Sequence, residues 1–264
     1  MKKYVFLISQ IYLISLAISQ DNKVFQSFEN EYNLGYSFEE GGLINGKSSQ
    51  STYSLQSLNV EVERLFNNNI WLDASINTVT NYNQVNLGNL NGGNGSGIAF
   101  GQYPFLLGFR VKVGYGFNLL KDKLQLLPYG FLGRDSNWST STILSNGGEN
   151  LTRQNFYDGG VGVRLSYIVI KPLLLYLDES YIYNWDNSGA IKSIQTDNSF
   201  YGKSFAATNY NFTSTIGVVY NVFRNFQLGT NFYWTNYQPQ SNIAGIVYTP
   251  SNTYGSMLRI GLTY

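Results

Sequence analysis

The sequence lacks two residue types entirely, because its 264 residues include no cysteine and no histidine. Without cysteine, the chain can form no disulfide, no metal thiolate and no lipid-acylated N-terminal cysteine. Without histidine, it lacks the residue that most often serves as a general base and as a metal ligand. Paired acids such as Glu61 and Glu63 share one face simply because strand residues alternate. We therefore expect no catalytic residues, no metal site and no cofactor.

Charge and long apolar runs are also scarce. Charged residues make up 12% of the chain, against roughly 25% in soluble domains. The 17 basic and 16 acidic residues nearly cancel, so nothing predicts a nucleic-acid partner. Mean hydropathy is −0.17, and no long apolar run follows residue 19, which excludes membrane-spanning helices. Such a chain can cross a membrane only with strands whose residues alternate between lipid and lumen.

The first residues have the three parts of a secretory signal peptide. Lys2 and Lys3 precede an apolar stretch over 4–18, and Ala17 and Ser19 are small residues before a cleavage point. The apolar stretch is shorter than the roughly 20 residues of a membrane anchor. We therefore predict a signal peptide over 1–19 and a single mature domain over 20–264.

Apolar residues alternate with polar ones in ten segments. The clearest is 28–38, where Phe28 and Tyr32 share a face with Leu34, while Glu29 and Glu31 share the other. A period of two over about eleven residues predicts a tilted membrane strand. In 127–131 the apolar, outward positions are Leu127, Tyr129 and Phe131. The other segments are 58–62, 70–76, 105–117, 161–169, 173–183, 212–222, 226–234 and 258–264.

The connections between these segments alternate between short and long. Short links are expected at 67–69, 119–123, 171–172 and 223–225, and long polar loops at 40–51, 83–102, 137–154, 186–209 and 238–252. This asymmetry predicts an all-β, transmembrane, antiparallel up-and-down β-barrel with short periplasmic turns and long extracellular loops. The pattern predicts ten strands. The alternatives are eight strands, if two of the segments are loop hairpins, and twelve strands. The adjacent Asp178 and Glu179 leave one carboxylate pointing outward unless the strand has a bulge.

Aromatic residues cluster near both ends of the predicted strands, as in the interfacial girdles of membrane barrels. Those expected at the inner end are Phe66, Trp71, Phe117, Phe223, Phe226 and Tyr264. A secreted sandwich that stacks carbohydrate would also be rich in aromatics. It would not explain the apolar outer faces.

The last segment alternates apolar residues up to the C-terminal aromatic, at Leu258, Ile260, Leu262 and Tyr264. It resembles the C-terminal insertion signal of bacterial outer-membrane barrels. With the strand at 109–117 and the Leu127-Pro128-Tyr129-Gly130 entry after a Lys121-Asp122-Lys123 turn, the chain resembles small outer-membrane β-barrels of the OmpA-like transmembrane-domain and OmpX/Opa type. The resemblance implies that the protein lies in the outer membrane, where lipid and lipopolysaccharide surround it. It also implies the barrel-assembly machinery and periplasmic chaperones as folding partners.

Charged residues on the inward positions form one candidate site, a lumen charge network. Its acids are Glu29, Glu31, Glu61, Glu63 and Asp73, and its bases are Arg110, Lys112, Arg134, Arg164 and Arg259. Barrels of about eight strands fill their interior with side chains, which favours an ion-paired plug. The alternative is a gated pore in which these charges exchange partners. Closure of the barrel should place Arg259 against Glu29 or Glu31.

Two functional hypotheses remain. The long polar loops, rich in Asn, Ser, Gly and Tyr, favour a surface-exposed structural or adhesin-type protein with a host or envelope ligand at its loops. The alternative is a narrow gated pore for small solutes.

Overall fold

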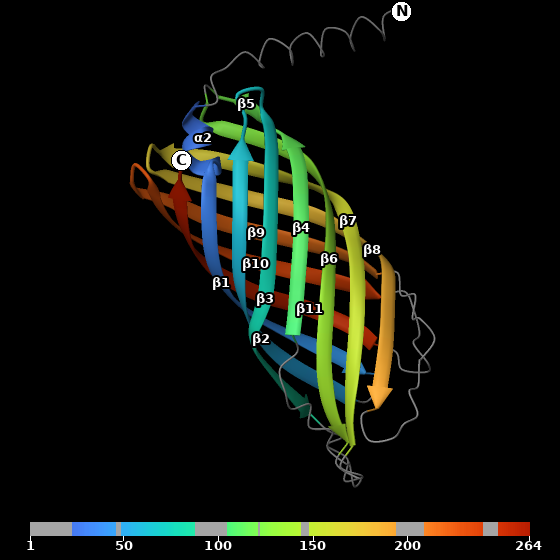
Figure 1. Cartoon of the computed structure of the whole chain (residues 1–264). Helices are drawn as coiled ribbons and strands as arrows, with labels where there is room; N and C mark the ends of the chain where they lie inside the picture. Colours follow the sequence, from blue (N-terminus) through green and yellow to red (C-terminus); the bar gives the residue numbers. More distant parts are fainter. Residues whose placement is uncertain are drawn as a thin grey trace, which may run out of the picture.

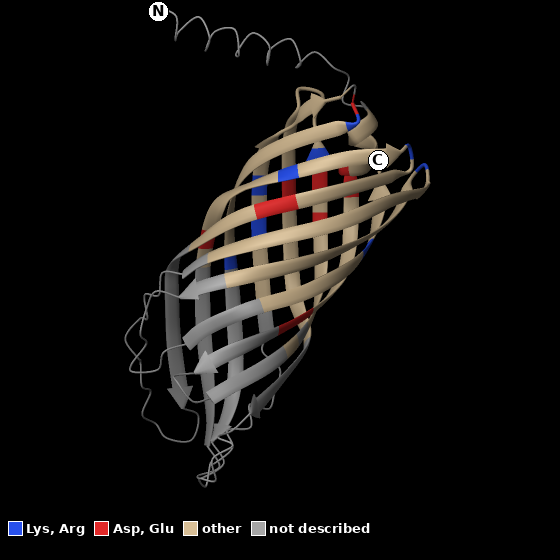
Figure 2. Cartoon of the chain, turned by 180° about the vertical axis from the view of Figure 1, so that it is seen from behind, with Lys and Arg blue, Asp and Glu red and all other residues tan. Residues whose placement is uncertain are grey.

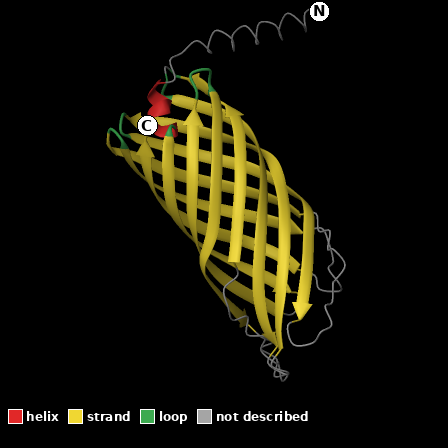
Figure 3. Cartoon of the chain, in the orientation of Figure 1, coloured by secondary structure: helices red, strands yellow, loops and turns green. Residues whose placement is uncertain are grey.

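The described part of the chain folds into a β-barrel with a short helix at one end (Figures 1 and 3). The computed structural model describes residues 23–45, 49–87, 105–120, 122–143, 148–193, 209–239 and 248–264. The predicted signal peptide lies outside these residues. The elements are α2 (Lys23–Glu29), β1 (Glu31–Asn45), β2 (Ser49–Leu65), β3 (Ile70–Leu87), β4 (Phe105–Tyr115), β5 (Phe117–Leu119), β6 (Leu124–Ile143), β7 (Gly148–Ile170), β8 (Leu173–Ser193), β9 (Asn209–Phe223), β10 (Phe226–Pro239) and β11 (Tyr248–Thr263).

Every strand pairs antiparallel with its sequence neighbour, and β1 pairs with β11 to close the sheet. Strands β4 and β5 form one barrel strand, since both pair with β6 in an unbroken register from Gly114↔Tyr129 to Phe117↔Leu126. Pro128 lies in the gap, and it has no N–H to donate to the ladder. The predicted ten-stranded antiparallel barrel is therefore confirmed.

The four predicted short links all lie at one end, here called the turn end, together with α2 and the C terminus (Figure 1). The two shortest are Lys171–Pro172 and Arg224–Asn225, each a two-residue turn. Asn69, Leu120 and Asp122 have positive φ angles, which reverse the chain within a few residues. The opposite end of the barrel is called the loop end below.

The strands are longer than predicted, so the expected loops are largely wrong in their extent. Strand β7 has 23 residues and β6 has 20, whereas about 9–11 tilted residues cross a bilayer. Most of the segment 137–154, expected to be a loop, belongs to the β6–β7 hairpin. The pattern failed there because strand residues that leave lipid and face water on both sides need not alternate. The central parts of the expected loops, such as 88–104 and 194–208, lie outside the described residues.

The first strand begins later than predicted. It starts at Glu31, and Phe28 and Glu29 belong to α2. Phe28 is buried rather than outward, because α2 turns into the barrel mouth. The Gln227 amide donates to the Ser27 carbonyl (2.9 Å), and the Gln26 amide donates to the Leu65 carbonyl (3.2 Å). These bonds hold α2 across the turn end, with Phe25 and Phe28 buried beneath it.

The inside and outside faces follow the predicted alternation on most strands, with β6 as the exception. Leu127, Tyr129 and Phe131 face the lumen, and Leu132 is 66% exposed on the outer face. The prediction assumed that the apolar residues of a strand face outward. It failed because here the large apolar residues occupy the inward positions, while Pro128 and Gly130 occupy outward ones. Trp71 is also fully buried in the lumen rather than part of a girdle.

The adjacent acids of β8 divide between the two faces. Strand β8 pairs with β7 and β9 without a register shift at Asp178 and Glu179. Asp178 is buried inside the barrel, so Glu179 points outward. There the Ser214 hydroxyl donates to Glu179 at 2.6 Å. One carboxylate therefore lies on the outer face, held by a hydroxyl of the neighbouring strand.

Candidate functional site: the charged lumen

The lumen holds most of the acidic and basic residues whose side chains the structure describes. These residues lie mainly in the half of the barrel nearest the C terminus (Figure 2). They come from inward positions of β1 to β4, β7, β8 and β11 and from α2. Neighbouring glycines make room for the larger inward rings. A Cβ at Gly162 would overlap the ring of Tyr129, and a Cβ at Gly217 would overlap that of Tyr176. Glycine on one strand thus fixes where the aromatic residue of the next strand lies.

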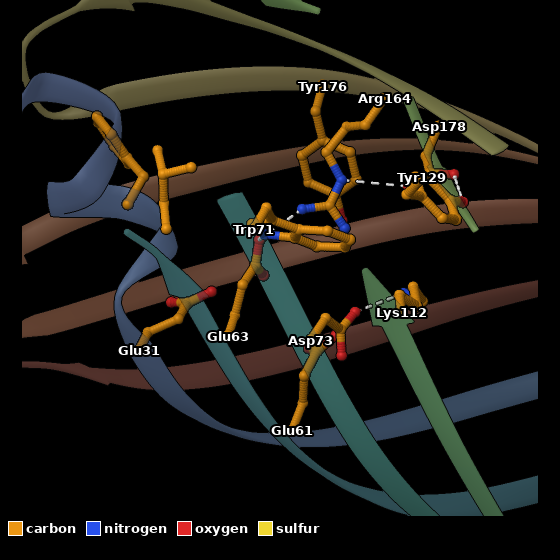
Figure 4. Close-up of polar contacts among 12 residues, drawn as sticks. Glu31, Glu61, Glu63, Trp71, Asp73, Lys112, Tyr129, Arg164, Tyr176 and Asp178 are labelled. Atoms are coloured by element: carbon orange, nitrogen blue, oxygen red, sulfur yellow. Dashed lines mark hydrogen bonds and ion pairs between the residues drawn. The ribbon is translucent and has the colours of Figure 1, made fainter. Parts of the chain in front are cut away.

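Arg164 is the centre of the largest polar cluster (Figure 4). Its Nη1 lies 2.7 Å from Glu63 Oε1, and its Nε lies 3.2 Å from Asp178 Oδ2. The Trp71 indole N–H also donates to Glu63 (2.7 Å), and the Tyr129 hydroxyl donates to Asp178 (2.5 Å). All five residues are buried, with at most 8% of their surface exposed. The guanidinium is therefore paired on two sides, in a site from which its partners exclude most water.

Two further cations have acidic partners nearby. Lys112 Nζ lies 2.6 Å from Asp73 Oδ2. Arg259 Nη1 lies 3.8 Å from Glu31 Oε1 and 3.6 Å from Glu61 Oε2. The expected approach of Arg259 to Glu31 is present, but Glu61, rather than Glu29, is the second carboxylate beside it. Arg259 sits between two acids at distances too long for strong hydrogen bonds.

A fourth base, Arg110, is paired farther toward the loop end. The Arg110 guanidinium binds the buried carboxylate of Asp158, and it also lies over the Phe131 ring, 5.2 Å from its centroid. Asp158 points inward because it lies on β7 in phase with Arg164, and the pairing of β7 with β6 has no register shift. It lies over Gly133, where a Cβ would meet its carboxylate.

The structure places nine of the ten expected network residues in the lumen, but Arg134 is an exception. Arg134 is exposed on the outer face, with its guanidinium 5.2 Å from the ring centroid of Tyr157. The reason is the inverted alternation of β6, which sends even-numbered residues outward. Glu29 lies inside the barrel as part of α2 rather than of a strand.

Sequence reasoning left several lumen residues out of the network, namely Gln125, Tyr129, Asp158, Tyr176 and Asp178. The alternation of β7 places Asp158 inside, but the predicted strand began at Val161 and so excluded it. Tyr129 and Tyr176 had an available signal, since each pairs in register with a glycine of the next strand.

A polar cavity of about 210 Å³ lies beside these ion pairs. Its walls include the bases Arg110, Lys112, Arg164 and Arg259 and the acids Glu61 and Asp178, and hydroxyl and amide side chains complete it. The volume is enough for several waters. Within the described ranges, no cluster of three or more acidic side chains has the geometry of a metal site. No helix in the described part of the chain is long and apolar enough to span a membrane.

Neither a protein-family model nor a curated protein sequence matches the chain. Solved structures with a similar fold include outer-membrane proteins. The outer membrane protease OmpT of Escherichia coli is 12% identical, with a TM-score of 0.46, over 87% of this chain and 95% of OmpT. Ail, the attachment invasion locus protein of Yersinia pestis, is 10% identical, with a TM-score of 0.32, over 89% and 98%. The KdgM porin is 8% identical, with a TM-score of 0.36, over 88% and 99%. At such identities the likeness concerns the fold alone.

Proposed function

We propose that this chain, which has the closed architecture of bacterial outer-membrane β-barrels, is an integral outer-membrane protein with a plugged lumen. Its function lies at the loop end, where it acts as a surface-exposed structural or adhesin-type protein. The absence of histidine supports a role that is not catalytic.

The outer face supports the membrane location. Its exposed side chains near the turn end are mostly apolar, as lipid requires. They include Leu34, Val60, Leu72, Val113, Val163, Leu175, Ile216, Leu228, Ile260 and Leu262. Exposure of so many large apolar side chains on every side would favour aggregation in water. A surrounding bilayer removes this cost.

The closed turn end is the observation that carries the plugged-lumen proposal. Phe25 and Phe28 of α2 are buried across the mouth of the barrel, and the Arg164 cluster is buried inside the lumen. A solute on a path through the lumen would have to break buried ion pairs and displace α2. Buried charges that lose their partners cost about 3–5 kcal/mol, so a spontaneous opening is rare.

The length of the strands directs attention to the loop end. Strands β6 and β7 remain paired as far as Ile143↔Gly148, well beyond the roughly 9–11 residues that cross a bilayer. The barrel therefore continues outside the membrane as a rigid support for its connections. Binding residues commonly sit on loops held by such a scaffold.

Topology can be tested with an inserted epitope tag. A tag between Ile143 and Gly148 should bind antibody on intact cells, whereas the same tag between Lys171 and Pro172 should bind only after the outer membrane is opened. The opposite labelling pattern would refute the orientation. Labelling of both sites in cytosolic fractions alone would refute the membrane location.

Binding at the loop end can be tested by shortening one hairpin. Ser139 and Thr152 pair in register on β6 and β7, so removal of 140–151 and closure with a short turn should leave the rest of the barrel paired. The variant should assemble normally but lose adhesion of expressing cells to host cells or to envelope material. Unchanged adhesion, together with a similar result for the other hairpins, would contradict the adhesin-type role.

The polar cavity favours a second candidate, a narrow gated pore. Four bases line this cavity, and the single helix α2 closes the turn end. Refolded protein should be silent in planar bilayers if the lumen is plugged, and removal of 23–29 should produce conductance. Steady channels in the unmodified protein, with an ion selectivity that changes in Arg110→Ala, would instead establish the pore.

A further inference from the structure

A small cradle lies over Gly261, at the seam where the first and last strands close the barrel. Gly261 of β11 pairs with Asn33 of β1 on one side and with Gln227 of β10 on the other. The point that a Cβ of Gly261 would occupy lies 2.7 Å from Glu31 Oε2 and 2.7 Å from Asn33 Oδ1. Gln227 forms the third wall, with its Cβ 3.4 Å from the same point. Because both oxygens lie 2.7 Å from this point, they are at most 2 × 2.7 = 5.4 Å apart.

Both oxygens of this Gly261 cradle are acceptors without a donor. The Asn33 amide is held in one orientation, because its Nδ2 donates to Glu31 Oε1 (2.7 Å) and lies 3.4 Å from Glu61 Oε2. Asn33 Oδ1 therefore faces the cradle. Among the described residues, no hydrogen-bond donor reaches this atom or Glu31 Oε2. Their side chains are 4% and 1% exposed, and buried acceptors without a partner are costly.

The charge balance around the cradle is negative. Seven buried carboxyl groups of the described chain face only four bases in the lumen, and six remain against four bases when Glu29 is protonated. The carboxylates are Glu29, Glu31, Glu61, Glu63, Asp73, Asp158 and Asp178, and the bases are Arg110, Lys112, Arg164 and Arg259. Arg259 is shared between Glu31 and Glu61 at 3.8 and 3.6 Å, so it does not fully neutralise either. A group of positive charge is therefore missing beside Glu31.

We propose that the Gly261 cradle binds a small monovalent cation of the size of sodium. Carboxylate and amide oxygens are the ligands that hard cations prefer. One carboxylate supplies charge for a monovalent ion, whereas a calcium site uses several acids and six to eight oxygens. The ion joins two side chains of β1 over the backbone of β11, and it thereby stabilises the closure of the barrel. This site is independent of any activity at the loop end.

The first test is the stability of the refolded full barrel in vesicles, measured by urea unfolding. Sodium chloride should raise the unfolding midpoint above that in choline chloride of equal ionic strength. The ion binds the folded state. Once the sodium concentration is well above the dissociation constant of the site, each tenfold increase in it should therefore raise the folding equilibrium constant about tenfold. Equal midpoints in the two salts at all concentrations would overturn the proposal.

Two variants test the site itself. Gly261→Ala places a methyl group at the ion position and should abolish the sodium dependence. Glu31→Gln should fold well without the ion, because its new amide N–H can donate to Asn33 Oδ1, and it too should lose the sodium dependence. The matched control is Gly130→Ala, whose Cβ would have open space, the nearest atom being 3.8 Å away. It should keep the full sodium effect.

The competing occupant is a proton shared between the two oxygens. It would stabilise the barrel as the pH falls, with no difference between sodium and choline, and this result would overturn the cation. Sodium dependence that survives in Glu31→Gln would place the ion elsewhere and would also overturn the assignment. Loss of folding in Gly261→Ala leaves Glu31→Gln as the deciding variant.

Discussion

At the scale of single residues, position inside or outside the barrel decides what a charge does. Arg164 and Arg134 are both arginines of long strands, and sequence reasoning assigned both to the lumen. Arg164 is buried between Glu63 and Asp178, whereas Arg134 is exposed beside Tyr157. The first holds two carboxylates in a site of low dielectric constant, and the second makes one surface contact.

This contrast predicts unequal effects on stability. Arg164→Ala leaves Glu63 and Asp178 buried without their cation and should lower the free energy of unfolding by about 3–5 kcal/mol. Arg134→Ala, the matched control, should change it by no more than about 1 kcal/mol. Urea unfolding in vesicles measures both. Similar losses in the two variants would mean that the lumen is wet enough to screen its charges.

At the scale of elements, α2 is held at the turn end by side-chain hydrogen bonds to its neighbours, and it carries a buried carboxyl group. Glu29 is the residue of α2 that enters the lumen. Burial raises the pKa of the Glu29 carboxyl well above its usual value, and nearby Glu63 raises it further while Arg164 opposes this. The docked helix therefore binds a proton that the free helix releases.

The sign of the pH effect follows from this shift. A carboxyl whose pKa is raised in the folded state contributes stability at low pH, and this contribution is lost as the pH rises through the raised value. The unfolding midpoint should thus fall as the pH rises from the ordinary carboxyl pKa of about 4.3 through the raised value. Glu29→Gln should flatten this dependence. A wild-type profile that rises over the same window would contradict the assignment to Glu29.

At the scale of the whole molecule, the last strand completes the barrel. β11 pairs with β1 and β10, and Leu258, Ile260, Leu262 and Tyr264 are all about half exposed on the outer face. The Tyr264 ring lies 4.8 Å from that of Tyr32 on β1. These residues therefore belong to the seam at which the sheet closes.

We predict that the change of both Leu262 and Tyr264 to serine permits export but blocks outer-membrane assembly, because the closing strand loses its lipid-facing side chains. The folded fraction, read from the heat-modifiable band in membrane fractions, should fall to a small part of the wild-type level. The change of Thr263, whose position alternates with theirs, to serine is the control and should assemble normally. A normal band in the double variant would refute the role of this segment.

Local pattern determined much of this protein. Period-two alternation favoured ten strands, and composition excluded membrane-spanning helices, disulfides and thiolate metal sites. This information is local because each residue of a membrane strand faces either lipid or lumen. The same rule placed Val161 and Val163 outside and Glu61 and Glu63 inside, as the structure has them.

Only the tertiary structure decided the rest. On strand β6 the apolar side chains face inward, because Pro128 and Gly130 occupy outward positions. Asp158 of β7 meets Arg110 of β4, which is not its neighbour in the sheet. The ion pairs of Arg164 join β7 to β2 and β8, and the Gly261 cradle joins β1 to β11. Such contacts depend on strand register and barrel closure, which bring residues more than a hundred positions apart into reach, and no local pattern encodes them.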